Sequence, residues 1–141
     1  MISDECKAKL TDMNNSTQTQ TSGSYKDLIV WQKSIVLVRE IYELTKTFPN
    51  EEKFGLVSQM RRAAVSVPSN IAEGQARRTT PDFVRFVSNA EGSLAELDTQ
   101  LIIALQLGFC NEARSEKCFD LIEENKKMLN ALRRKLMARS G

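Results

Sequence analysis

Two arginine pairs flank a short segment of the chain and are the side chains best suited to bind phosphate. Arg61 and Arg62 precede the segment SVPSNIAEG, and Arg77 and Arg78 follow it after two further residues. A guanidinium group presents a planar fork of donors that matches two phosphate oxygens at once. We therefore expect these four arginines to contact nucleic-acid phosphates. A second basic patch is expected at Arg133, Arg134 and Lys135.

Ordinary ion pairing is the alternative role for these cations. Arg62 could pair with Glu73, or with a carboxylate of the acidic segment that follows. Residues 53–78 carry five basic side chains and one acidic, whereas residues 79–110 carry one basic and four acidic. The whole chain has a net charge of only +2, whereas a dedicated nucleic-acid-binding protein usually has a strongly basic face.

Carboxylates offer the chemistry of a different function class, a magnesium-dependent nucleotide hydrolase. Glu73, Glu91, Glu96 and Asp98 could hold magnesium inside a helical protein. However, Glu96 and Asp98 are two residues apart, so a helix would point them to different faces. Histidine is absent, which removes the commonest general base and the commonest metal ligand. We therefore expect no enzymatic activity, no metal and no cofactor.

Cysteine spacing and hydropathy predict the cellular compartment of the protein. Cys6, Cys110 and Cys118 are an odd number without the spacing of a zinc site, and no histidine accompanies them as a catalytic base. The first residues are polar, so no signal peptide is expected. No apolar run reaches the length of a membrane span. These features predict a reduced, cytoplasmic protein.

Four segments have the apolar periodicity of amphipathic helices. We expect a disordered polar segment over residues 1–24, and helices over about 26–47, 53–76, 81–108 and 111–137. Short connections make neighbouring helices antiparallel, so residues 25–138 are predicted to form an all-α, up-down four-helix bundle. Thr80 is the predicted N-cap of the third helix. The stripes expected to face the core are Leu28, Trp31, Ile35, Val38, Tyr42 and Thr45 in the first helix; Val57, Met60, Ala64, Val67 and Ile71 in the second; Phe83, Phe86, Ala90, Leu94, Leu97, Leu101 and Ala104 in the third; and Cys118, Ile122, Asn125, Leu129, Leu132 and Leu136 in the fourth.

Pro68 stands inside the second predicted helix and predicts a kink there. A proline within a helix removes one backbone hydrogen bond and crowds the preceding turn, at a cost of about 3 kcal/mol. Ser66 and Ser69 are expected to return hydrogen bonds to the freed backbone groups. Gly74 is expected at the end of this helix.

The third predicted helix is apolar on more than one side near its end. Residues 101–109 read LIIALQLGF, and Ile103 and Leu107 point away from the stripe that faces the core. A helix that is apolar on both sides must be covered on both sides. We therefore expect Ile103 and Leu107 to contact another copy of the chain. The alternative is a helix that is buried more deeply than average.

Three segments form a pattern that belongs to a known family. Residues 27–34 read DLIVWQKS, residues 48–74 read FPNEEKFGLVSQMRRAAVSVPSNIAEG, and residues 83–109 read FVRFVSNAEGSLAELDTQLIIALQLGF. They closely resemble the four-helix bundle proteins encoded in intervening sequences within bacterial 23S rRNA genes. The family pattern falls here on Ser66, Pro68, Ser69, Asn70, Glu73 and Gly74.

The resemblance implies partners as well as a fold. It implies a ring-like homopentamer without established enzymatic activity. It also implies kinship with the accessory variability protein of diversity-generating retroelements, a basic pentamer that binds nucleic acid and a reverse transcriptase. Asn70 and Glu73 are then expected to hold helix ends or subunit contacts. The expected function is an oligomer that binds RNA, DNA or a nucleoprotein partner such as a reverse transcriptase. A structural hub for a protein partner is the alternative.

Overall fold

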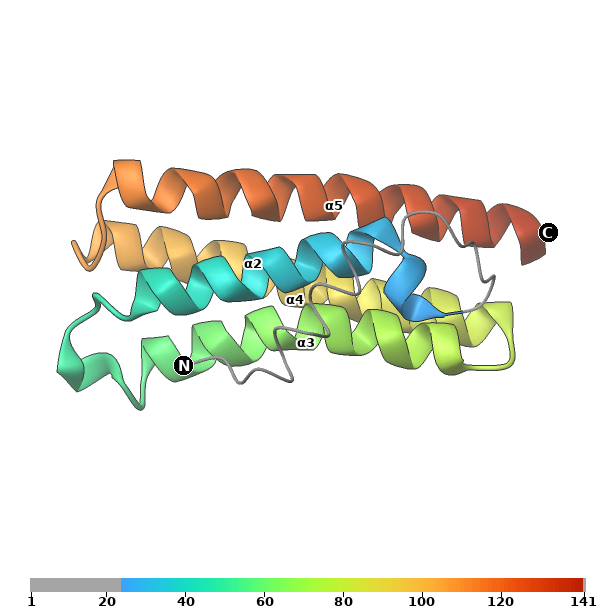
Figure 1. Ribbon diagram of the computed structural model, residues 1–141, viewed down its shortest axis with the longest axis horizontal. Helices are drawn as coiled ribbons and strands as arrows, with labels where there is room; N and C mark the ends of the chain where they lie inside the picture. Colours follow the sequence, from blue (N-terminus) through green and yellow to red (C-terminus); the bar gives the residue numbers. More distant parts are fainter. Residues whose placement is uncertain (1–23, 141) are drawn as a thin grey trace.

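The computed structural model describes residues 24–140, within which four α-helices form a bundle (Figure 1). None of the helices in this range combines the length and the apolar character needed to cross a membrane. The segment expected to be disordered lies, except for Ser24, outside the described residues. The predicted all-α four-helix architecture is confirmed. The elements are two short 3₁₀ turns, η1 (Tyr25–Asp27) and η2 (Asn50–Glu52), and the helices α2 (Ile29–Thr45), α3 (Leu56–Ala76), α4 (Thr80–Gln106) and α5 (Glu112–Ser140).

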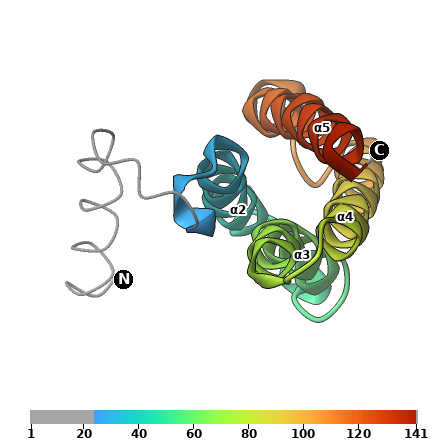
Figure 2. The ribbon, with the colours of Figure 1, turned by 90° about the vertical axis from the view of Figure 1, so that its right-hand side faces the viewer.

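The helices run antiparallel, and ion pairs between α2 and α5 establish the register. Lys33 pairs with Glu124 at 3.2 Å, and Glu40 pairs with Lys117 at 3.1 Å. Seven residues forward along α2 therefore correspond to seven residues backward along α5. Each helix packs against the next one along the chain, and α5 also packs against α2. The end view shows this closed arrangement of the four helices (Figure 2).

Local side-chain and backbone hydrogen bonds determine where α4 begins and ends. The Thr79 hydroxyl accepts a hydrogen bond from the backbone N–H of Asp82 at 3.3 Å, so Thr79 is the N-cap. The predicted N-cap, Thr80, is instead the first helical residue. After α4, Gly108 adopts a φ of 76°, and two backbone hydrogen bonds close the helix end in a Schellman motif.

The buried core follows the predicted stripes in α3, α4 and α5, apart from partly buried Phe83 and Leu132. In α2 the predicted stripe lies to one side of the centre of the core: Thr45 is buried, whereas Trp31 and Val38 are partly buried and pack against the core. Trp31 lies at the edge of the core, where its ring meets the Tyr25 ring edge-on at 5.4 Å, and Tyr42 is exposed. The buried residues of α2 are Val30, Ser34, Leu37, Ile41, Leu44 and Thr45.

Pro68 is buried inside α3, which continues through it for two further turns. Two serine hydroxyls bond to backbone carbonyls around the proline: Ser66 donates to Ala63 at 2.7 Å, and Ser69 donates to Val65 at 2.9 Å. These carbonyls stand on either side of the one that the proline leaves without its usual N–H partner. The expected serine bonds therefore form, but to the neighbouring carbonyls rather than to the freed one.

Gly74 allows α3 and α4 to approach each other closely. A Cβ atom at this position would lie 2.7 Å from the Cβ of Phe86 and 3.0 Å from Cδ1 of Phe83. Only a residue without a side chain fits at these distances. The predicted role of Gly74 as a helix end is wrong, because α3 continues to Ala76 and Gly74 does not have a positive φ.

The change Gly74→Ala is expected to lower the free energy of unfolding by ~1–3 kcal/mol, because the added methyl group overpacks the contact with Phe86. Urea unfolding followed by circular dichroism measures this effect. Gly92→Ala is the matched control, since a Cβ there meets nothing within 4 Å. That change should raise the free energy of unfolding by ~0.5–1 kcal/mol through helix propensity. A loss of stability at both positions, or at neither, would contradict the close-approach explanation.

Candidate nucleic-acid interface

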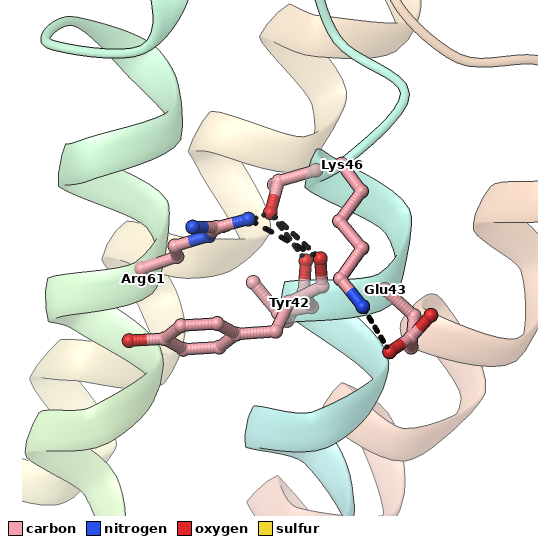
Figure 3. A network of polar contacts seen from close by, with 6 residues as sticks. Tyr42, Glu43, Lys46 and Arg61 are labelled. Carbon is pink, nitrogen blue, oxygen red and sulfur yellow. Dashed lines mark hydrogen bonds and ion pairs between the residues drawn. The ribbon is translucent and has the colours of Figure 1, made fainter. Parts of the chain in front are cut away.

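Arg61 bridges α2 and α3 (Figure 3). Its Nε donates to the Thr45 hydroxyl at 2.9 Å, and its Nη2 donates to the Tyr42 carbonyl at 3.4 Å. The guanidinium carbon also lies 4.4 Å from the centroid of the Tyr42 ring. One turn away, Lys46 donates to Glu43 at 2.8 Å and lowers the pKa of that carboxyl group. Arg61 is therefore largely engaged inside the protein, unlike the free phosphate ligand that the sequence predicts.

Arg62 is exposed. The expected alternative, an ion pair with Glu73, does not form: neither residue takes part in an ion pair among the described residues 24–140. The two residues are eleven positions apart along α3, a rise of about 16 Å. The Arg62 guanidinium is consequently available to an anion from solvent.

Arg77, directly after α3, and Arg85 of α4 both lie over the ring of Phe86. The Arg77 guanidinium carbon lies 4.8 Å from the Phe86 centroid, and that of Arg85 lies 5.0 Å from it. The two guanidinium groups are therefore no more than about 10 Å apart. Arg78 is exposed beside them, and Asp82 approaches Arg85 at 3.7 Å. We call Arg77, Arg78 and Arg85 the Phe86 arginine cluster.

The two arginine pairs do not form one continuous patch. Arg77 follows Arg61 by 16 positions, which corresponds to about 24 Å along a helix. One pair therefore lies near the beginning of α3, and the other lies at its end. Arg85 was not among the predicted site residues, because it is the single basic residue of an acidic segment.

The three residues of the second expected basic patch, Arg133, Arg134 and Lys135, have different surroundings. Arg133 donates to Glu91 at 2.8 Å and to Asn130 at 2.8 Å, so it joins α5 to α4. Arg134 and Lys135 are exposed. The end of α5 lies at the same end of the bundle as the turn between α3 and α4 (Figure 1). These two cations therefore lie at the same end of the molecule as the Phe86 arginine cluster.

The polar residues of the family pattern bond within α3 or face solvent. The Asn70 amide donates to the Ser66 carbonyl at 2.7 Å, so both residues support the middle of the helix. This is not the helix-end role expected for Asn70. Ser69 and Glu73 are exposed.

The four carboxylates considered for magnesium are not brought together. Glu91 is bonded to Arg133, Glu96 accepts from the Gln100 amide at 3.1 Å, and Asp98 pairs with Lys126 at 3.4 Å. Within residues 24–140 no three carboxylate or thiol side chains gather as a metal site would require.

Thiolate chemistry is also disfavoured at the buried thiol. Burial, with a smaller contribution from the Glu40 carboxylate, raises the pKa of Cys118 to about 11. The thiol therefore stays protonated at neutral pH and is a poor nucleophile. Burial likewise raises the pKa of Cys110.

A groove between α2 and the start of α3 was not predicted from the sequence. Its volume is about 490 Å³, and Phe54 at its rim is 90% exposed. The one sequence signal is an aromatic residue inside the otherwise polar segment NEEKFG. We call it the Phe54 groove, and its lining residues are Tyr42, Lys53, Phe54, Val57, Ser58, Arg61, Arg62 and Val65.

The end of α4 presents apolar side chains to solvent. Ile103 is 43% exposed and Leu107 is 59% exposed, and neighbouring Ile102 is 46% exposed. The alternative of a more deeply buried helix is therefore wrong for this chain taken alone.

Comparisons with known proteins give a family and a fold. The family model described as 23S rRNA-intervening sequence protein matches residues 26–131. A solved structure of a protein with unknown function, from the S23 ribosomal protein family of Bacteroides thetaiotaomicron, is similar with a TM-score of 0.67. The two chains are 20% identical over 74% of this chain and 97% of that one, a similarity that concerns the fold alone. No curated protein matches the chain.

The contacts of Arg61 predict that it stabilises the bundle, whereas Arg62 does not. Arg61→Ala should lower the free energy of unfolding by ~1–2 kcal/mol, because it removes the hydrogen bond to the Thr45 hydroxyl and the contact of the guanidinium group with the Tyr42 ring. Arg62→Ala, the matched control, should change it by less than ~0.5 kcal/mol. Urea unfolding of both variants measures the difference, and equal effects would mean that the α2–α3 bridge contributes nothing.

Proposed function

Since the chain belongs to the 23S rRNA-intervening sequence protein family, we propose that it is a non-enzymatic oligomer that binds nucleic-acid phosphates. The observation that carries the proposal is the Phe86 arginine cluster. It places two guanidinium groups within about 10 Å of each other on one ring. Nothing in the family description indicates an enzyme.

Stacking on Phe86 orients the arginines without using up their donors. A guanidinium group that lies over an aromatic face keeps its N–H edge free to fork onto a phosphate. Among residues 24–140 no carboxylate pairs with Arg77 or Arg78, and the pair of Arg85 with Asp82 is long and exposed. Such an exposed pair contributes little, so a phosphate can replace the carboxylate.

Two cations of α5 lie near the same end of the bundle. Arg134 and Lys135 are exposed near the same end of the bundle as the Phe86 arginine cluster (Figure 1). Several cations at one end of the molecule produce a local positive potential although the net charge of the whole chain is only +2.

Self-association would strengthen weak binding by repeating the surface. We also propose that Ile103 and Leu107 contact another copy of the chain, in the ring-like pentamer that the family resemblance implies. Two large apolar side chains one helical turn apart, both more than 40% exposed, support this contact. Repeated phosphate sites would then act multivalently. A structural hub that captures a protein, without affinity for nucleic acid, is the alternative that this apolar surface would also serve.

The logarithm of the affinity for a labelled RNA hairpin with a single-stranded tail should fall linearly as the logarithm of the salt concentration rises. The change Arg77→Gln/Arg78→Gln/Arg85→Gln should lower that slope by about two to three units, because each lost phosphate contact removes about one. Fluorescence anisotropy across a salt series measures both slopes.

A charge-matched variant controls for net charge alone. Arg39→Gln/Arg114→Gln/Lys127→Gln removes three exposed cations of α2 and α5 and should leave the slope nearly unchanged. Equal slopes for both triple variants would show that the Phe86 arginine cluster is not part of the interface. Absence of binding at low salt would exclude the nucleic-acid function and favour the protein hub.

The apolar contact has a separate test. Ile103→Glu/Leu107→Glu should convert the oligomer to monomers in light scattering, because a carboxylate in an apolar interface loses its hydration. Ile29→Glu is the control at another exposed apolar position, 63% exposed at the start of α2, and should leave the mass unchanged. A wild-type monomer would contradict self-association directly.

A further inference from the structure

The Phe54 groove is lined by cations, whereas a second groove, between α4 and α5, is lined by carboxylates. Lys53, Arg61 and Arg62 contribute three cations to its lining, and no carboxylate lines it. The groove of about 540 Å³ between α4 and α5 has the opposite character, with Glu112, Glu116 and Asp120 and no cation. The Phe54 groove therefore selects an anionic partner.

Two aromatic rings stand in the Phe54 groove beside these cations. The Phe54 ring is 90% exposed, and the Lys53 ammonium lies 5.7 Å from its centroid. The Tyr42 ring extends from α2 towards α3 beside Arg61 (Figure 3), whose guanidinium carbon lies 4.4 Å from the ring centroid. Arg61 is itself held by its bond to Thr45. The Arg61 guanidinium group, which lies over the Tyr42 ring, therefore restricts the orientation of that ring and acts as a positioning residue.

We propose that the Phe54 groove binds single-stranded nucleic acid, with unpaired bases stacked on Phe54 and Tyr42 and phosphates paired with Lys53 and Arg62. This inference rests on the proposed function and adds the class of nucleic acid. Proteins that bind single strands combine a cationic groove with aromatic rings on which bases stack. Every base offers such a face, so the site needs no sequence preference.

The geometry favours an unpaired strand over a duplex or a protein. In a duplex the base faces are already stacked on one another, so the rings would have nothing to stack on. A protein partner usually anchors a side chain in a well-packed, desolvated pocket. Here the aromatic ring of Phe54 instead projects into solvent, which suits a flat base.

The experiment compares four labelled probes on the full chain by fluorescence anisotropy. They are an oligoadenylate of about 12 nucleotides, a duplex of the same length, an abasic sugar-phosphate strand and polyglutamate. The wild type should bind the oligoadenylate more tightly than the duplex or the abasic strand. Phe54→Ala should weaken oligoadenylate binding roughly 5- to 150-fold, the equivalent of one lost base stack. It should leave affinity for the abasic strand unchanged.

Two further variants separate stacking from general surface effects. Phe54→Trp should retain affinity, and its added fluorescence should be quenched when the oligoadenylate binds. Ile29→Ala removes an exposed apolar side chain outside the groove and should change no affinity.

The outcomes distinguish this inference from the proposed function. If the abasic strand binds in a salt-dependent manner while Phe54→Ala has no effect on oligoadenylate, phosphate binding stands and base stacking is overturned. If duplex and single strand bind equally, the inference also fails. If polyglutamate alone binds and requires Phe54, the groove docks an acidic protein. If none of the probes binds, both the inference and the proposed function are wrong.

Discussion

The close approach of α3 to α4 at Gly74 is the constraint on which the rest of the structure depends. Because no side chain stands at Gly74, the Cβ of Phe86 occupies the space beside it. The Phe86 ring is thereby held at the turn between the two helices, where Arg77 and Arg85 stack on it. A packing requirement inside the bundle thus determines where a cationic surface forms outside it.

The bundle pairs several of its own acidic residues with cations of neighbouring helices. Glu91 and Asp98 of α4 are paired with cations of α5, although the two segments are far apart in the sequence. At Lys126, burial lowers the pKa but the carboxylates of Asp98 and Glu123 outweigh it, so the pKa is raised. The positive charge of α3 therefore remains uncompensated at its surface, which is why a chain of low net charge can still present cationic sites.

The two proposed contact sites suit different parts of one strand. The Phe86 arginine cluster offers donors that match phosphate oxygens, whereas the Phe54 groove adds aromatic faces that match bases. They lie near opposite ends of α3, separated by about 24 Å. A flexible single strand can follow such a path, and engagement at both sites multiplies weak affinities without requiring a large net charge.

Amphipathic periodicity in the sequence determined the four helices and the buried residues of α3, α4 and α5, because each of these helices has one dominant apolar stripe. In α2 two apolar stripes lie side by side, so only the packing of α3 and α5 around it decided that Leu37 rather than Trp31 is fully buried. Residue type and position in the sequence predicted that Arg61, Arg62 and the Arg77–Arg78 pair are phosphate ligands. Tertiary contacts then engaged Arg61 internally and added Arg85 to the cluster, since hydrogen-bond and ring partners from other helices are invisible to local sequence patterns.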